Sequence, residues 1–140
     1  MTFDKPKVFI IDDDPGVVFL HEIIIKESHL TAHPECFIDA RKALDYIFTM
    51  DVNSSRLLIF LDINMPKMSG WDFLELLTNK IKKADIKVVM VTSSLSKVDR
   101  EKSEKFPLVI DFWEKPINET QSLKLQEKLE SWLLPADKRS

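Results

Sequence analysis

The stretch LLIFLDINMPKMSG, residues 57–70, decides how the rest of the chain is interpreted. Residues 57–61 form a continuous apolar run that is too short for a buried helix, so they predict a strand covered on both faces. Asp62 ends this strand, and a loop closing at Gly70 separates it from helical periodicity over residues 71–83. Ligands of open parallel α/β sheets bind at the carboxyl ends of strands. Asp62 is therefore a candidate site residue, although a lone aspartate after a strand more often caps a turn.

Length and composition describe one globular domain. The chain has 140 residues, 44% of them hydrophobic and 31% charged, which suits a single sizeable core. The net charge of −3 argues against binding nucleic acid through the overall field, so we expect no direct DNA binding. Without a membrane-length apolar stretch or a signal-peptide pattern, we expect no membrane association and a cytoplasmic protein. Cys36, the single cysteine, is expected to be a structural thiol, and the histidines lack metal-ligand spacing and suit surface or packing roles: His21, His29 and His33.

Apolar runs alternate with helical patterns along the whole chain. Five strands are predicted, over residues 8–11, 31–37, 57–61, 87–91 and 108–113, and a helix follows each of them. This alternation implies a three-layer α/β domain with right-handed crossovers. Pro34 cannot donate to a strand ladder and places the second strand at a sheet edge. The strand order 2-1-3-4-5 meets that requirement, so we predict a flavodoxin-like (βα)5 fold with a doubly wound parallel sheet.

Three of the predicted helices carry specific expectations. Asp39 is a plausible N-cap for the second helix. The charged segment 96–105 opens with a cap-like Ser96 and has only Val98 to bury, so this helix should be weakly anchored and is where we expect a response. The last helix is expected to run on to Pro135 with a buried stripe of Leu125, Leu129, Trp132 and Leu133.

The predicted strand order brings polar residues from four strand ends together. Asp12 and Asp13 follow the first strand, Asp62 the third, Thr92 the fourth and Lys115 the fifth. Three carboxylates in one pocket repel, so either one is protonated or a cation lies among them. A few oxygen ligands that leave room for water and phosphate suit Mg²⁺.

Four segments, FIIDDDP, LDINMPKMSG, VVMVTSS and DFWEKP, resemble the response-regulator receiver domain of two-component signalling, in the family's order and at its usual intervals. The resemblance spans nearly the whole chain. It implies a stand-alone, chemotaxis-regulator-like receiver over residues 1–135, a short tail at 136–140 and no output domain. It also implies a signalling domain rather than an enzyme, although one that catalyses its own phosphorylation and dephosphorylation.

By this resemblance, Asp62 is the phosphorylation site and accepts a phosphoryl group as an aspartyl phosphate. Asp13 and Asp62 are expected to be direct Mg²⁺ ligands, with Mn²⁺ as an alternative ion. Asp12 is expected to bind directly or through water, and the backbone carbonyl of Asn64 completes the set. Asp14 lies outside this set and is expected to cap a helix.

The resemblance assigns roles to the remaining motif residues too. Thr92 and Lys115 are expected to bind phosphate oxygens. Thr92 and Phe112 are expected to switch the surface, with an ordinary core residue as the alternative for Phe112. The Lys115–Pro116 peptide is expected to be cis. Trp113 lies on the opposite face of its strand and either packs inside or contacts a partner.

Further positions bear on the lifetime of the aspartyl phosphate and on the conformation of two loops. Asn64 and Ser94, two residues beyond Asp62 and Thr92, are expected to tune dephosphorylation. Ser93 replaces the family's common alanine, and residues 106–108, FPL, replace its usual Gly-Ala pair, so loop geometry and partner stay open.

Partners and rival classes complete the interpretation. A sensor histidine kinase or histidine phosphotransfer protein, a downstream protein target, and a monomer or phosphorylation-dependent dimer are expected. A haloacid dehalogenase-type phosphatase would carry a DxDx[TV] motif at its first strand and an acidic pair late in the chain. Here the acidic pair comes first and that motif is absent from the sequence. A nucleotide or flavin domain would need a glycine-rich loop, and only Gly16 and Gly70 are present. The strongest rival is a receiver-like module that binds partners without phosphorylation.

Overall fold

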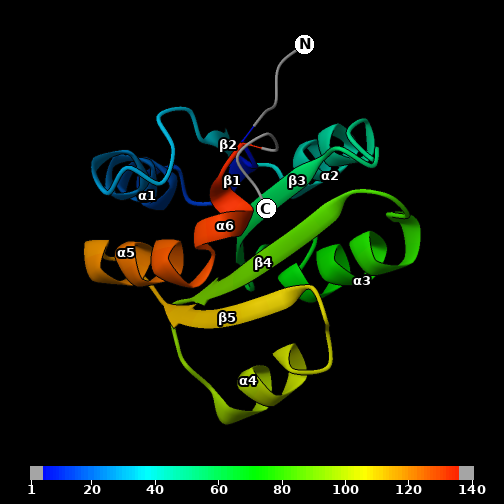
Figure 1. The fold of residues 1–140 in the computed structure, drawn as a ribbon. Coiled ribbons are helices and arrows are strands. Elements are labelled where there is room, and N and C mark those ends of the chain that lie inside the picture. Colours follow the sequence, from blue (N-terminus) through cyan, green and yellow to red (C-terminus); the bar gives the residue numbers. More distant parts are fainter. Residues whose placement is uncertain (1–4, 136–140) are drawn as a thin grey trace.

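A computed structural model of the protein describes residues 5–135, which form one central sheet with helices on both faces (Figure 1). The strands are β1 Lys7–Ile11, β2 Glu35–Phe37, β3 Arg56–Asp62, β4 Asp85–Thr92 and β5 Val109–Glu114. The helices are α1 Pro15–Glu27, α2 Ala40–Phe48, α3 Gly70–Lys80, α4 Lys97–Ser103, α5 Glu119–Lys128 and α6 Glu130–Leu133. The tail expected at 136–140 lies outside the described residues.

The strand order is β2-β1-β3-β4-β5 with every pair parallel, which confirms the predicted flavodoxin-like topology. Within residues 5–135, β2 pairs only with β1 and is the edge strand required by Pro34. The prediction of a strand over 31–37 was wrong in length, because ladder pairing with β1 begins at Glu35, directly after the proline that cannot donate.

Two apolar clusters flank the sheet. One joins the sheet to α2 and α3, and the other joins it to α1 and α5. Figure 1 shows these two helix pairs on opposite sides of the sheet. All seven residues of β3 are buried, so the apolar run 57–61 is covered on both faces as predicted.

Side-chain caps start α1, α2 and α4 where the sequence predicts them. The Asp14 carboxylate accepts from the backbone N–H of Gly16, and the Asp39 carboxylate accepts from that of Arg41. The Ser96 hydroxyl accepts from the N–H of Asp99. These bonds satisfy N–H groups that have no partner inside the helix.

The third helix ends at Lys80 and not at residue 83 as predicted. The reason is the Asp51 carboxylate in the loop before β3. It accepts the backbone N–H groups of Lys82, Lys83 and Ala84 at 3.0, 2.7 and 2.9 Å, respectively. Those N–H groups are thereby used by a loop contact and no longer continue the helical pattern.

The expectation that Val98 would be the buried residue of α4 was wrong, because its side chain is 73% exposed. Two cationic side chains approach aromatic rings instead. The Arg100 guanidinium lies 5.3 Å from the Phe112 ring centre, and Lys102 Nζ lies 5.0 Å from the Trp71 ring centre. These two contacts, which we call the cation–aromatic contacts of α4, tie this helix to β5 and α3.

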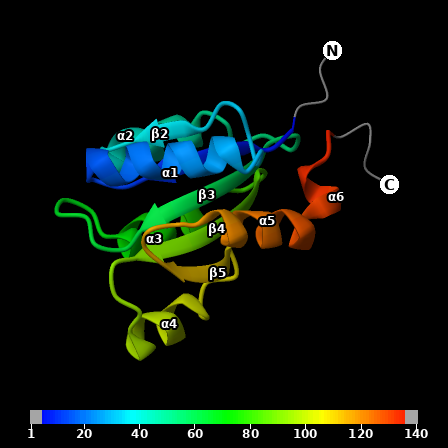
Figure 2. The same ribbon diagram turned by 90° about the vertical axis from the view of Figure 1, so that its left-hand side faces the viewer.

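The predicted last helix is two helices. Leu129 leaves the helical conformation, with φ −105° and ψ 16°, and the short α6 follows. Buried Arg56 donates to the carbonyls of Trp132 and Leu134, and the Trp132 indole N–H donates to Asp85 Oδ2 at 2.8 Å. These contacts turn α6 onto the end of the sheet opposite the loop that follows β3 (Figure 2).

Candidate functional site

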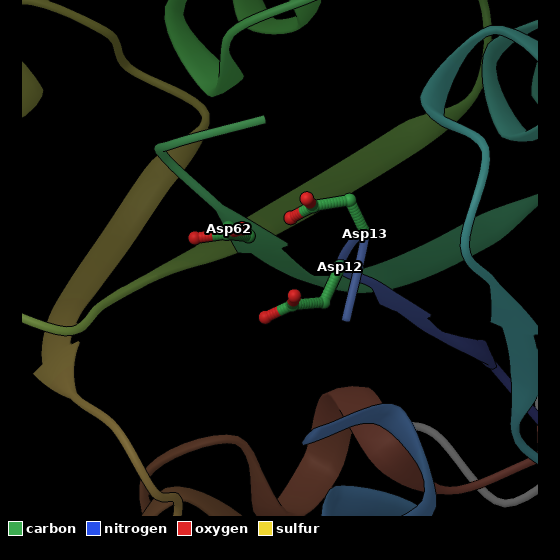
Figure 3. Close-up of side chains that lie close together, drawn as sticks. All are labelled: Asp12, Asp13 and Asp62. Atoms are coloured by element: carbon green, nitrogen blue, oxygen red, sulfur yellow. The ribbon is translucent and has the colours of Figure 1, made fainter. Parts of the chain in front are cut away.

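Three carboxylates meet at the carboxyl end of the sheet. Ile11 pairs with Leu61, so the residues that follow them, Asp12 and Asp62, come out side by side. One oxygen each of Asp12, Asp13 and Asp62 lies within 4.8 Å of the others. Figure 3 shows the three side chains directed toward the same space. Asp12 and Asp62 are buried and Asp13 is exposed.

Lys115, from the end of β5, contacts two of these carboxylates. Its Nζ lies 2.7 Å from Asp12 Oδ2 and 3.0 Å from Asp62 Oδ1. Burial lowers the pKa of Lys115, but hydrogen bonds to the two carboxylates outweigh it and raise the pKa above its ordinary value. The side chain is therefore a stable cation within the cluster.

The electrostatics of Asp62 favour a cation at this site. Burial raises the pKa of Asp62 to about 6, the hydrogen bond from Lys115 opposes this rise, and the charge of Asp12 adds to it. Within residues 5–135, Asp62 Oδ2 is buried without a hydrogen-bond partner. This buried carboxylate oxygen lies next to two further carboxylates. Together, these oxygens are ligands that fit a hard divalent cation such as Mg²⁺.

A cavity of about 540 Å³ opens over the cluster. Asn64 lines it, and the Asn64 backbone N–H donates to Asp62 Oδ1 at 3.3 Å. Thr92 is buried, and its hydroxyl donates to the Ser94 carbonyl at 3.2 Å. A contact between the Thr92 hydroxyl and a group on Asp62 thus requires this local bond to Ser94 to break.

The remaining predicted residues lie on and after β5. The Lys115–Pro116 peptide is cis. Phe112 is directed inward, 7% exposed, within the apolar cluster on the α2 and α3 side. Of the two alternatives for Trp113, the structure supports packing, because its ring is 8% exposed and lies 5.7 Å from that of Phe60.

Comparison with protein families matches residues 8–127 to the response regulator receiver domain. The chain belongs to this family. A two-component response regulator from Cytophaga hutchinsonii is 25% identical, with 91% of this chain and 98% of that chain covered and a TM-score of 0.77. A response regulator receiver protein from Dyadobacter fermentans is 26% identical, covering 90% and 96%, with a TM-score of 0.75. No curated protein sequence matches the chain.

A Vibrio cholerae chemotaxis protein shares the fold of this receiver domain at 21% identity, with a TM-score of 0.65 and coverage of 94% of this chain and 100% of that one. Receiver domains are signalling domains of two-component systems. They bind a divalent metal through acidic residues and interact with histidine kinases and downstream targets. Across residues 5–135 of this receiver domain, no helix has the length and apolarity that a membrane crossing needs.

Of the surface and packing roles predicted for His21, the structure of this receiver domain supports packing, but sequence reasoning missed the hydrogen bond that this buried histidine makes. His21 is 2% exposed, and its Nε2 accepts a hydrogen bond from the backbone N–H of Ile117 at 3.1 Å. A signal was present, because His21 shares helical spacing with Val18 and Ile25, which are both buried. A histidine on the apolar face of α1 therefore had to find a polar partner inside the fold.

His21 predicts a pH dependence of the stability of the receiver domain. Burial, aided by Lys115 and opposed by Asp12, lowers the pKa of His21 to about 4 from 6.5. The unfolded chain therefore binds this proton first, and the stabilisation present above pH 6.5 is lost as the pH falls toward 4. We expect the contribution of His21 to lower the free energy of unfolding by about 1–2 kcal/mol when the pH falls from about 7 to about 5.

Urea unfolding of wild type and His21→Gln at both pH values measures this contribution. Asp62, whose pKa is raised, acts in the opposite direction over the same range, so the difference between the two proteins isolates His21. An equal pH dependence in both proteins would contradict the prediction.

Proposed function

We propose that this receiver domain accepts a phosphoryl group on Asp62 from a sensor histidine kinase or a histidine phosphotransfer protein, in a Mg²⁺-dependent reaction. The proposal depends on one observation. Lys115 Nζ reaches the carboxylates of both Asp12 and Asp62 at the mouth of a cavity. A nucleophile, a fixed cation and space for a donor group are thus found together.

The reaction is a transfer between two covalent partners. A carboxylate oxygen of Asp62 attacks the phosphorus, a P–O bond forms, and the P–N bond to the donor histidine breaks. The imidazole nitrogen leaves with the electron pair and takes up a proton. Catalysis of such a transfer consists mainly of positioning and of neutralising oxygen charge.

The chain's own residues supply the positioning. Lys115 offers a cation to a phosphate oxygen in exchange for its contact with Asp62 Oδ1. Thr92 offers its hydroxyl to another oxygen once it leaves Ser94. Asp13, Asp62 and the Asn64 backbone carbonyl would hold a Mg²⁺ or Mn²⁺ ion directly, and Asp12 would hold it directly or through water. A bound ion would neutralise part of the phosphoryl charge.

Phosphorylation changes a protein–protein surface formed by α4, β5 and α5. The modification adds about one unit of negative charge and new acceptor oxygens next to Thr92. Movement of Thr92 frees space toward Phe112, whose ring is in contact with Arg100 of α4. The exposed side chains of Asn64 and Ser94 flank the phosphoryl group and set how fast water removes it.

Incubation of the whole chain with a small-molecule phosphodonor and Mg²⁺, followed by intact mass measurement, tests the proposal. Wild type is expected to gain one phosphoryl group, and Asp62→Asn none. Asp39→Asn is the matched control, because asparagine also caps a helix and this position lies outside the carboxylate cluster. An unmodified wild type would instead favour a module that binds partners without phosphorylation.

A further inference from the structure

The loop between β5 and α5 carries Lys115, and three of its backbone N–H groups donate hydrogen bonds. The Lys115 N–H donates to the Thr92 carbonyl at 2.7 Å, and the Asn118 N–H donates to Gln121 within the capping box of α5. Between them, the Ile117 N–H donates to His21 Nε2. The first bond ties the loop to the sheet and the last ties it to its own helix.

The bond from Ile117 joins the loop to a helix that is distant in the sequence. His21 belongs to α1 and lies 96 positions from Ile117 in the chain. The same helix lines the cavity over the carboxylates through Val17 and Leu20. The bond from His21 therefore fixes the Lys115 loop relative to the helix that borders the cavity.

The chemistry of His21 suits a fixed acceptor. Burial holds the pKa of His21 near 4, so at neutral pH the imidazole is uncharged and its Nε2 accepts. Ile117 is itself 2% exposed, so an aliphatic side chain at position 21 leaves a buried N–H without a partner. The loop then gains freedom two residues from the Lys115 ammonium.

We propose that His21 is a positioning residue for Asp62 phosphorylation, acting through Ile117 on the placement of Lys115. This inference rests on the proposed function. Small displacements matter here, because Lys115 Nζ must meet two carboxylates at 2.7 and 3.0 Å. Misplacement of a reacting group by about 1 Å can cost about 100-fold in rate.

Single-turnover phosphorylation by a small-molecule phosphodonor with saturating Mg²⁺ tests the inference. His21→Leu is expected to lower the maximal rate about tenfold, with a much smaller change in the donor concentration at half-maximal rate. His21→Gln, which keeps an acceptor, should recover most of the rate. His21→Met, unbranched and similar in size, replaces the leucine variant if that variant does not fold.

Two further proteins separate positioning from a general loss of stability. Ser28→Ala removes a buried bond, 2.7 Å long, from the C-cap of α1 to Ser122 without touching the Lys115 loop, and should react at the wild-type rate. In a Lys115→Ala background, His21→Leu should have no further effect, because the residue it positions is gone. An additive effect there, or a wild-type rate for His21→Leu, overturns the inference, whereas an unreactive wild type overturns the proposed function itself.

Discussion

Lys115→Ala is expected to lower the rate of Asp62 phosphorylation by about 100- to 1,000-fold, the usual cost of removing one fixed donor to a developing oxygen charge. The ammonium is the one side-chain cation bonded to this cluster among residues 5–135, at 2.7 Å from Asp12 and 3.0 Å from Asp62. It is also mostly buried, so solvent screens its charge only weakly.

Phosphorylation rates at saturating donor and Mg²⁺ measure this loss. Lys115→Arg keeps the charge but presents a planar fork instead of a compact ammonium, so we expect only partial recovery. Lys128→Ala is the matched control, because Lys128 is exposed and bonds to the Ile110 carbonyl away from the cluster. Equal rates for Lys115→Ala and Lys128→Ala would exclude a role for Lys115 in the transfer.

Gly70→Ala is expected to destabilise the receiver domain by about 3 kcal/mol, at the upper end for overpacking of a core. A Cβ at this position would lie 2.5 Å from the backbone oxygen of Asp62, 3.0 Å from Ile63 Cα and 3.1 Å from Met90 Cε. Two of these three neighbours are backbone atoms, which cannot rotate away. Gly70 is also tied in place, since its N–H donates to the Ile63 carbonyl at 2.8 Å.

Urea unfolding followed by circular dichroism measures the cost at Gly70. Gly16→Ala is the matched control, because the nearest atom to its Cβ is a side-chain oxygen of Asp14 at 3.3 Å, and we expect a change within about 1 kcal/mol. The two alanines enter the first turns of α3 and α1, so helix propensity acts on both. Similar unfolding free energies for the two variants would show that the strand end yields to the added methyl group.

Much of this fold could be predicted from local patterns. The buried run 57–61, the proline that selects an edge strand and the helix caps each act over a few residues, so the sequence displays them directly. The meeting of Asp12, Asp62 and Lys115 followed from the strand order, because parallel strands deliver their carboxyl ends to one edge.

The features that escaped prediction are made by single contacts between distant segments. Arg56 and Trp132 are 76 positions apart, and no pattern in the sequence predicts the bond between them that turns α6 away from α5. The bond from the Thr92 hydroxyl to Ser94 is local, but the side-chain rotamer that makes it is equally invisible in a sequence. The prediction that Val98 is buried failed for a related reason, since apolar character alone does not show whether a neighbouring surface covers the side chain.

The cation–aromatic contacts of α4 imply a low threshold for detaching this helix. Contacts of this kind at exposed positions are worth about 0.5–1 kcal/mol each, so the pair together contributes about 1–2 kcal/mol. Coupling free energies between distant sites are typically about 1–3 kcal/mol, which is a comparable amount. A rearrangement that withdrew the Phe112 ring from Arg100 would therefore remove an amount of stabilisation comparable to part of such a coupling free energy.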